Sequence, residues 1–478
     1  MLVASMLRQA ERRAATVALA DLERSLTWPQ LLERVEKAAG HLRSHGLRPG
    51  HHVGIAVPDN ADFVVLVLAA LQLGLVIVPI DWRSKTQERA ALVRGFSLRA
   101  MVVPALLARE PGQVPWPMAE TQAPVLEFVE PDADEPCAIL LSSGTTGAPS
   151  GALVSRAAME HRLTEGGNAA FPIAGHRYLS FLPLCFANGI SQALRNLVAG
   201  NAVIIHPVLF TAKELVDAVK AFDATYIGIV PTTLRALLQL SDEQLAGLQG
   251  LRAIRVAGSA MTASEKRACV SRIGARLYHG YGASAFGPIC HWSSELPEMP
   301  PDSVGKPYDW VQLRIVDAEG QVLAQGETGL LELRGPSLAM ALLPVDGEPI
   351  ALADQWYAPG DIARLDDGGY LYLVGRATDV IIRGGVNVYP ELVESALLLH
   401  PAVTDVAAVG RPASGLGEEV VAFVVINRPA RSEDLLAHCR SHLSSKYRPA
   451  EIHIVEQLPR TASGKVKRSE LREKILNS

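Results

Sequence analysis

The sequence predicts an α/β protein with two domains, on three observations. Short apolar strands alternate with amphipathic helices up to about residue 300, a pattern typical of layered, largely parallel sheets. From about residue 305 the strands are separated by turn clusters, and the last hundred or so residues return to short strands and helices, enough for a separate domain. The length of 478 residues exceeds one ordinary core. We therefore expect a large N-terminal domain (residues 1–377) of layered sheets and helices with a β-rich subdomain, and a small α+β domain (residues 378–478).

Capping boxes and apolar runs place the individual elements. A capping box predicts a helix start, and the chain has Thr27 with Gln30, Thr211 with Glu214 and Thr262 with Glu265. Strands of the N-terminal domain are expected at residues 52–57, 75–80, 202–206, 226–230 and 252–256. The β-rich part has strands at 311–316, 329–334 and 370–374, and the C-terminal domain has strands at 403–409 and 420–426 and a helix at 433–443.

Composition and charge exclude several classes of protein. Residues 63–80 carry no charge and reach spanning length, but Gly74 and Pro79 interrupt them, which favours a buried helix followed by a buried strand. No basic region precedes an apolar run at the N-terminus, and the five cysteines form no CxxC pair. We expect a cytoplasmic protein without a transmembrane segment, zinc ribbon or disulfide framework. The net charge of −5 argues against nucleic acid as the main partner.

Residues 142–151 have the composition of a phosphate-binding loop. Glycines let the backbone approach an anion, and hydroxyl and N–H groups can hold phosphate oxygens. The residues expected to do so are Ser142, Ser143, Gly144, Thr145, Thr146 and Gly147. The Walker pattern GxxxxGK[ST] is not satisfied, so this is a different kind of loop. Taken alone, the segment fits an exposed turn equally well.

Three further short motifs lie downstream. Lys465 follows Gly464 near the end of the chain, where it is free to move. Asp361 follows Gly360 in a tight turn, where a carboxylate can bind two ribose hydroxyls. Two adjacent glycines, Gly384 and Gly385, allow a turn or the close passage of a ligand. Each motif alone is also compatible with an ordinary turn or bulge.

In this order, the motifs resemble those of the adenylate-forming superfamily, which includes acyl- and aryl-CoA synthetases, stand-alone adenylation enzymes and firefly luciferase. The resemblance runs essentially the whole chain, and so many short motifs in one order are highly specific. It rests on residues 142–151, Leu182-Pro183-Leu184, Val256-Ala257-Gly258-Ser259, Tyr281-Gly282-Ala283-Ser284, residues 357–361, Gly375-Arg376, Arg383-Gly384-Gly385-Val386-Asn387, Pro390, Glu391 and Ser463-Gly464-Lys465.

The resemblance implies two half-reactions and a set of residue roles. A carboxylate attacks ATP to give acyl-AMP and pyrophosphate, and a thiol of CoA or of a carrier protein's phosphopantetheine then displaces AMP. By resemblance Lys465 and Ser284 are catalytic, the lysine at the substrate carboxylate and both at the α-phosphate. Besides the phosphate loop, the implied nucleotide-binding residues are Gly258, Ser259, Ala260, Tyr281, Gly282, Asp361 and Arg376. Rotation about a hinge at Thr378 and Asp379 would withdraw Lys465 and bring Gly384 and Gly385 to the thiol tunnel.

The acyl pocket is expected at positions that match the family's acid-binding region. They are Phe186, Ala187, Asn188, Gly189, Gly228, Ser259 and Ala283. Amino-acid-activating relatives have a carboxylate where Ala187 stands, so a free amino acid is not expected as the substrate. Small residues at Ala187 and Gly228 leave room for a sizeable apolar or aromatic acid, and Phe186, in place of a common histidine, could stack on it.

Three departures from the family pattern keep alternatives open. Ser150 replaces a lysine of the phosphate loop, Ala285 replaces a glutamate that helps to hold Mg²⁺, and Thr378 replaces the usual hinge residue. No protein metal ligand is therefore predicted, and Mg²⁺ would be carried by ATP. The leading hypothesis is an AMP-forming acid–CoA ligase. The others are an adenylating enzyme that transfers its acyl group to an acyl carrier protein or an amine, and a nucleotide-binding homologue without catalysis.

Overall fold

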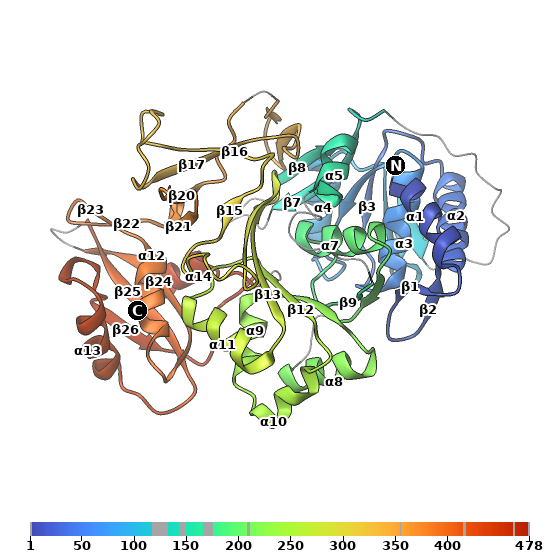
Figure 1. Ribbon diagram of the computed structural model, residues 1–478. Helices are drawn as coiled ribbons and strands as arrows, with labels where there is room; N and C mark the ends of the chain where they lie inside the picture. The colour runs from blue at the N-terminus through green and yellow to red at the C-terminus, as the bar shows by residue number, and fades with distance from the viewer. Residues whose placement is uncertain are drawn as a thin grey trace.

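The computed structural model (Figure 1) has four β-sheets with flanking helices in the part of the chain that it describes. The structure describes residues 2–116, 132–142, 150–165, 175–207, 211–353, 355–413, 417–461 and 464–476. Two large sheets, named A and B here, belong to the N-terminal part. A small sheet C follows them along the chain, and sheet D belongs to the C-terminal domain, which lies at the left in Figure 1.

Sheet A is mixed, with parallel strands at its centre. The pairs from β13 through β12, β11, β9 and β10 to β1 are parallel, whereas β14, β15 and β2 add antiparallel edges. In spatial order its strands are β15 (Lys306–Pro307), β14 (Gly287–Ser293), β13 (Arg276–Ala283), β12 (Ala253–Ala257), β11 (Tyr226–Ile229), β9 (Arg177–Ser180), β10 (Ala202–Ile205), β1 (Val17–Ala20) and β2 (Ser25–Thr27).

Sheet B has a parallel half and an antiparallel half. Strands β7, β4, β3, β5 and β6 pair in parallel, and β8, β18 and β19 extend the sheet in antiparallel fashion. In spatial order its strands are β19 (Ile350–Ala351), β18 (Ala341–Pro344), β8 (Ser150–Ser155), β7 (Pro136–Ser142), β4 (Val76–Pro79), β3 (His52–Ile55), β5 (Ala100–Pro104) and β6 (Gln113–Trp116).

Helices fill the space between these sheets and cover their outer faces. The helices of the N-terminal part are α1 (Leu2–Arg13), α2 (Trp28–Ser44), α3 (Ala61–Gln72), α4 (Thr86–Gly95), α5 (Arg156–Leu163), α7 (Ala187–Val198), α8 (Ala212–Ala221), α9 (Pro231–Leu238), α10 (Asp242–Leu245) and α11 (Ala263–Ile273). The largest core joins α2, α3 and α7 to strands of both sheets. Every residue of α3 is buried, which explains the uncharged run that the sequence showed before β4.

Sheets C and D make up the later part of the chain. Sheet C contains β16 (Gln312–Val316), β17 (Gly329–Arg334), β20 (Asp361–Leu365) and β21 (Leu371–Arg376). Sheet D contains β23 (Val386–Val388), β22 (Ile381–Arg383), β25 (Gly417–Ile426), β24 (Val403–Ala413) and β26 (Glu451–Ile454). Helices α12 (Pro390–Leu398) and α13 (Ser432–His442) pack on one face of sheet D and α14 (Arg468–Leu476) on the other.

The predicted fold class is confirmed, and most predicted elements begin or end within two residues of their observed bounds. The capping boxes at Thr211 and Thr262 form in both directions; for example, Glu214 N–H donates to Thr211 Oγ1 at 3.2 Å. At Thr27 only the backbone N–H takes part, and it donates to Gln30 Oε1 at 2.9 Å. Strands β24 and β25 are longer than predicted, because they continue as a hairpin to Ala413 and from Gly417. The two cores of sheet D contain only residues from Ile381 onward, while the boundary at residue 378 stays a prediction.

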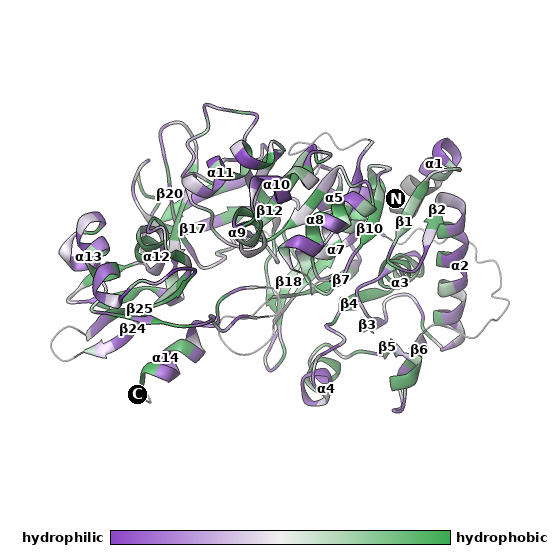
Figure 2. Cartoon of the chain, turned by 90° about the horizontal axis from the view of Figure 1, so that it is seen from below, coloured by the Kyte–Doolittle hydropathy of each residue, from purple (hydrophilic) through white to green (hydrophobic). Residues whose placement is uncertain are grey.

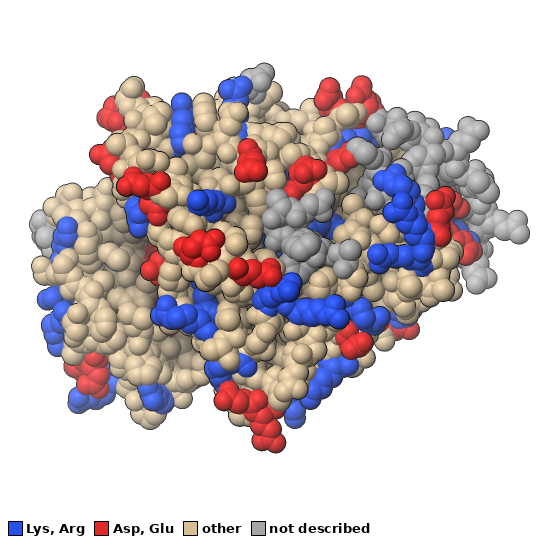
Figure 3. All heavy atoms as spheres, viewed as in Figure 1, with Lys and Arg blue, Asp and Glu red and all other residues tan. Residues whose placement is uncertain are grey.

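Surface properties agree with a folded globular chain. The outward residues of α2 are hydrophilic in Figure 2, and basic and acidic side chains are interspersed on the face in Figure 3. Among the described helices, none is both long and apolar enough to cross a bilayer. All five cysteines are buried and free.

Candidate active site

Asp361 is the centre of a buried polar group at the start of sheet C. Gly360, with φ of 84°, ends the preceding turn, and Asp361 begins β20 directly opposite Arg376 at the end of β21. Arg376 Nε lies 2.8 Å from Asp361 Oδ1, and the Tyr281 hydroxyl donates to Oδ2. Burial raises the pKa of Asp361, and Arg376 opposes that shift. The structure thus brings together three residues expected at the nucleotide.

Lys465 reaches this group from the C-terminal domain on a tight hairpin. The Thr461 N–H donates to the Lys465 carbonyl at 2.8 Å, and the Lys465 N–H donates to Thr461 Oγ1 at 3.1 Å. Arg460 bonds the Gly464 carbonyl and the Asp405 carboxylate, which ties the hairpin to β24. Ala462 and Ser463 lie outside the described residues.

The environment of Lys465 is formed by residues of the N-terminal domain. Burial and the nearby Arg376 charge lower the pKa of Lys465, and Asp361 acts in the opposite direction. Gly464, with φ of 84°, lies close to Val230 and Thr232 at the start of α9: a Cβ on Gly464 would be 3.9 Å from each side chain. The lysine is therefore docked beside Asp361 and Arg376 in this arrangement of the domains.

The phosphate loop is the connection between two antiparallel strands. Ser142 ends β7 and pairs with Ser150, the first residue of β8. Ser143, Gly144, Thr145, Thr146 and Gly147 lie outside the described residues, as does the Ser142 side chain. Their role at the phosphates stays a prediction.

The segment after β13 is held by an arginine that the sequence did not single out. Arg162 of α5 is buried and donates to the carbonyls of Ser284 (3.2 Å), Ala285 (2.7 Å) and Ser337 (2.9 Å). Burial lowers its pKa to about 10. The sequence around Arg162 did not indicate this role, because its hydrogen-bond partners are backbone carbonyls far away in the sequence.

The remaining predicted nucleotide positions lie at the ends of β12 and β13. Gly258 has φ of 106°, which a side chain rarely allows, and Ser259 and Ala260 follow it. The Ser259 carbonyl lies 3.0 Å from His279 Nε2, which fixes this turn against β13. Gly282 is close-packed, because a Cβ there would be 2.5 Å from the Gly287 carbonyl oxygen.

The predicted acyl-pocket residues lie on or directly beside α7, β11, β12 and β13, with Ser259 in the turn after β12. Phe186 precedes α7, and Ala187, Asn188 and Gly189 form its first turn, with Gly189 packed on the Pro183 carbonyl. Ala283 ends β13. The expectation of open space at Gly228 needs correction: a Cβ there would be 2.4 Å from the Tyr178 hydroxyl, so this tyrosine fills the space.

The predicted hinge directly follows Arg376, and the predicted tunnel residues lie on a hairpin of sheet D. Thr378 and Asp379 belong to a single 3-10 turn (Ala377–Asp379), and Asp379 lies 3.8 Å from Arg468 Nε. Gly384 and Gly385 both have positive φ, 57° and 78°, as a two-residue hairpin turn between β22 and β23 requires. Their predicted role at a thiol tunnel stays a prediction.

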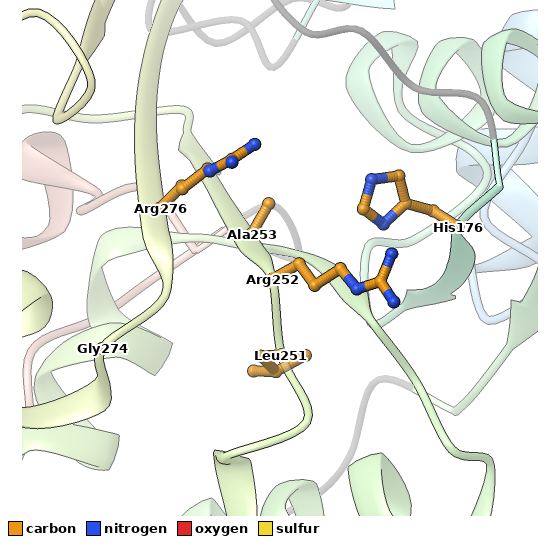
Figure 4. Close-up of a pocket in the computed structure, with 6 residues that line it drawn as sticks. All are labelled: His176, Leu251, Arg252, Ala253, Gly274 and Arg276. Carbon is orange, nitrogen blue, oxygen red and sulfur yellow. The ribbon is translucent and has the colours of Figure 1, made fainter.

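A separate cavity of about 310 Å³ lies away from this group (Figure 4). Its residues include His176, Arg252 and Arg276, which stand at the beginnings of β9, β12 and β13. Ser259 and Tyr281 lie beyond or near the opposite, carboxyl ends of the same strands. Ligands of open α/β sheets bind outside the carboxyl ends, so the Asp361 group is the better candidate for catalysis.

Comparison with known proteins identifies the family. Residues 6–343 match the family model of the AMP-binding enzyme, and residues 392–465 match that of the AMP-binding enzyme C-terminal domain. The chain belongs to the AMP-binding enzymes. It is a member of the adenylate-forming superfamily with an acid–CoA ligase-like architecture, as the motif order indicated.

Relatives of this AMP-binding enzyme match along nearly its whole length. It is 28% identical to a 2-succinylbenzoate–CoA ligase of Bacillus licheniformis over 97% of this chain and 98% of that protein. An indoleacetate–CoA ligase of Aromatoleum aromaticum is 29% identical, with 95% and 94% covered. A crystal structure of an anthranilate CoA ligase with anthranoyl-AMP superposes with a TM-score of 0.89 at 25% identity, covering 99% and 96%.

Proposed function

We propose that the protein activates a carboxylic acid with ATP and transfers the acyl group to the thiol of CoA. The observation that carries the proposal is the docking of Lys465 beside Asp361 and Arg376, two residues of another domain. A retained lysine whose pKa is shifted by the ion-paired Asp361 and Arg376 argues against the hypothesis of a non-catalytic homologue.

In the first step a substrate carboxylate oxygen bonds to the α-phosphorus of ATP, the bond to the β-phosphate bridging oxygen breaks, and pyrophosphate leaves. Asp361 accepts hydrogen bonds from the ribose hydroxyls. These bonds replace the hydrogen bond that the Tyr281 hydroxyl donates to Asp361, or are made beside it. Lys465 offsets the negative charge that the incoming carboxylate and the α-phosphate bring together. A preorganised cation in a partly dehydrated site stabilises such a transition state strongly.

In the second step the thiolate sulfur bonds to the acyl carbon, the bond from that carbon to the AMP phosphate oxygen breaks, and the thiol proton goes to solvent. Because Lys465 occupies the site in the docked arrangement, we propose that the C-terminal domain rotates at Thr378 and Asp379 between the steps. The glycine turn at Gly384 and Gly385 would then face the thiol.

A resident protein-bound metal does not fit the described residues. No group of three or more His, Cys, Asp or Glu side chains capable of holding an ion is found in the part of the chain that the structure describes. Ala285 is buried and contributes only a carbonyl, which Arg162 already occupies. We propose that Mg²⁺ enters with ATP, bound by the phosphates.

The acid is proposed to have an apolar or aromatic skeleton. Phe186, at the start of α7, offers a ring for stacking. The relatives named after succinylbenzoate, indoleacetate and anthranilate support an aromatic acid.

Pyrophosphate release tests the proposal directly. Purified protein is mixed with ATP, Mg²⁺ and a panel of aliphatic and aromatic acids, with and without CoA. Release that depends on one acid and yields a thioester with CoA supports the ligase. Release without thioester formation moves the acceptor to a carrier protein or an amine. Lys465→Ala should abolish release, whereas Lys467→Ala, an exposed lysine paired with Glu470, should not.

A further inference from the structure

Buried polar side chains gather on the face of sheet A beneath α7. In the parallel register Tyr226 pairs with Tyr178, and Arg255 pairs with both Gly228 and Tyr278, so these residues project from the same face. Tyr178 is fully buried and Arg255 is 8% exposed. The run around Arg255 is otherwise apolar, Ala-Ile-Arg-Val-Ala, where a charged residue is unusual.

A second arginine faces this group from the helix. Arg195 of α7 is 4% exposed. Burial and then the charge of Arg255 lower the pKa of Arg195 to about 10, which indicates that the two guanidinium groups lie near each other. The ring of Tyr308 adds a hydroxyl beside them, and its pKa is raised to about 12 by burial, against the effect of both arginines.

Two glycines let the polar ends of these side chains lean toward the catalytic group. A Cβ on Gly228 would be 2.4 Å from the Tyr178 hydroxyl, and one on Gly280 would be 2.9 Å from Arg255 Nη2. Each side chain therefore reaches past the residue it pairs with to a position two residues further toward the carboxyl end of the neighbouring strand. Gly280 directly precedes Tyr281, whose hydroxyl contacts Asp361. The arginine thus points along the strands toward the edge where the carboxylate is activated.

The charge of Arg255 has no protein counterion among the described residues. No described carboxylate forms an ion pair with it, and its Nε makes no hydrogen bond to that part of the chain. Nδ1 of His291, on the same face next to Gly280, is likewise buried and without a described partner. Burying a cation without an anion is costly, so an anion is expected to bind here when the site is in use.

We propose that Arg255, supported by the charge of Arg195, binds a second negatively charged group of the acid substrate. The substrate class is then a carboxylic acid that carries an additional carboxylate or sulfonate. The inference rests on the proposed function, because the first carboxylate is the one that ATP activates. The acid rather than the nucleotide is assigned to this place because Arg195 lies on α7, the helix whose first turn carries the predicted acyl pocket. Arginine pairs with either oxyanion in a two-point geometry.

Matched acids test the proposal on the unaltered protein. Acid-dependent pyrophosphate release is measured for benzoate, isophthalate and sulfobenzoate, and for pentanoate and glutarate. The value of kcat/KM should be about tenfold or more higher for at least one doubly charged acid than for its singly charged partner. Higher kcat/KM values for isophthalate and glutarate would identify the second charged group as a carboxylate. A higher kcat/KM value for sulfobenzoate would identify it as a sulfonate. If the singly charged acids are used equally well or better, the second-anion inference is wrong and the ligase stands. If no acid releases pyrophosphate, the proposed function itself fails.

A variant pair separates a specificity role from a structural one. Arg255→Met should lower the ratio of the two kcat/KM values about tenfold or more. Arg252→Met is the matched control, because Arg252 is exposed just before the same strand and lines the cavity at its opposite end. It should leave the ratio as in the parent protein. An equal loss for both acids in Arg255→Met would overturn the proposal. If that variant does not fold, thermal shift of the parent protein by isophthalate and not by benzoate decides the point instead.

Discussion

Two charges of opposite sign act on Lys465. The Arg376 guanidinium disfavours a second cation and the Asp361 carboxylate favours it, while partial burial removes water from the lysine. Burial and Arg376 together lower the pKa of Lys465 from its ordinary value of 10.5. Because Arg376 is ion-paired with Asp361 at 2.8 Å, its repulsion is partly offset, and a protonated lysine can dock. The residue therefore carries a titratable charge rather than a permanent one.

This environment predicts how adenylation depends on pH. In the proposed mechanism the first step requires protonated Lys465, so its rate should fall as the pH rises through the lysine pKa. Since that pKa is lowered, the falling limb of kcat/KM for ATP should be centred below 10.5. The measurement is pyrophosphate release at saturating acid across the alkaline range, expressed as kcat/KM for ATP because this ratio reports the enzyme before ATP binds.

Lys465→Arg provides the control for the pH profile. A guanidinium stays charged throughout this range, so whatever activity the variant keeps should lose the alkaline limb. An unchanged limb in Lys465→Arg would assign the titration to another group, such as the acid or ATP, and would remove this support for the role of Lys465.

At the scale of elements, α12 and β21 meet across the predicted hinge. Arg468, the first residue of α14, bonds Glu394 of α12 at 2.6 Å and lies 4.0 Å from Glu391. Burial and then the Glu394 charge raise the pKa of Glu391 to about 7, against the effect of Arg468. Gly375 of β21 lets α12 pack close to this strand, since a Cβ on Gly375 would be 2.6 Å from Glu391 Oε2.

Gly375→Ala should disturb the docked arrangement. The added methyl group would push α12 away from β21 and with it the domain that carries Lys465. Overpacking of this size typically costs about 1–3 kcal/mol, so pyrophosphate release should slow by about tenfold. Gly250→Ala is the control, because its Cβ would meet nothing within 4 Å. Trimming the partner in Gly375→Ala/Glu391→Ala should restore part of the rate. Absence of any rescue would show that the contact with Glu391 is not the cause.

The sequence predicts those elements whose signals are local. Capping boxes such as Thr211 with Glu214 and the uncharged run before β4 depend on neighbours along the chain, and their positions agree with the structure. The adjacent glycines at 384 and 385 similarly indicate a turn that needs positive φ.

Features that depend on register between distant strands were not predictable. Nothing near Arg162 indicates that it holds the carbonyl of Ala285, more than a hundred residues later. Nor does the sequence around Gly228 reveal that Tyr178 fills its space, because β9 and β11 are neighbours only in the folded sheet. Arg255 did carry a local signal, a lone charge in an apolar strand, which a search for buried cations would have found.

At the scale of the whole molecule, the C-terminal domain contacts the N-terminal domain at both ends of a docking surface. Gly464 packs near Thr232 at the start of α9, and Asn427 donates to the Gln239 side chain at 2.9 Å just beyond the end of that helix. The C-terminal domain therefore docks along helix α9 in the arrangement that places Lys465 near Asp361 and Arg376. In the proposed mechanism the thiol reaches the site only after this surface separates, so the two half-reactions should respond differently when the surface is locked.

A covalent lock at α9 tests this expectation. Gln239→Cys/Asn427→Cys places thiols on two side chains in contact at the exposed end of the surface, whereas all native cysteines are buried and should not react. After treatment with a short bismaleimide, the single-turnover burst of pyrophosphate should persist, because Lys465 stays docked. Transfer to the thiol should slow about tenfold or more. Each single-cysteine variant, treated in the same way, should keep both steps. Unimpaired transfer in the cross-linked protein would mean that the acceptor reaches the acyl-adenylate without domain rotation, and the role proposed for Thr378 and Asp379 would be lost.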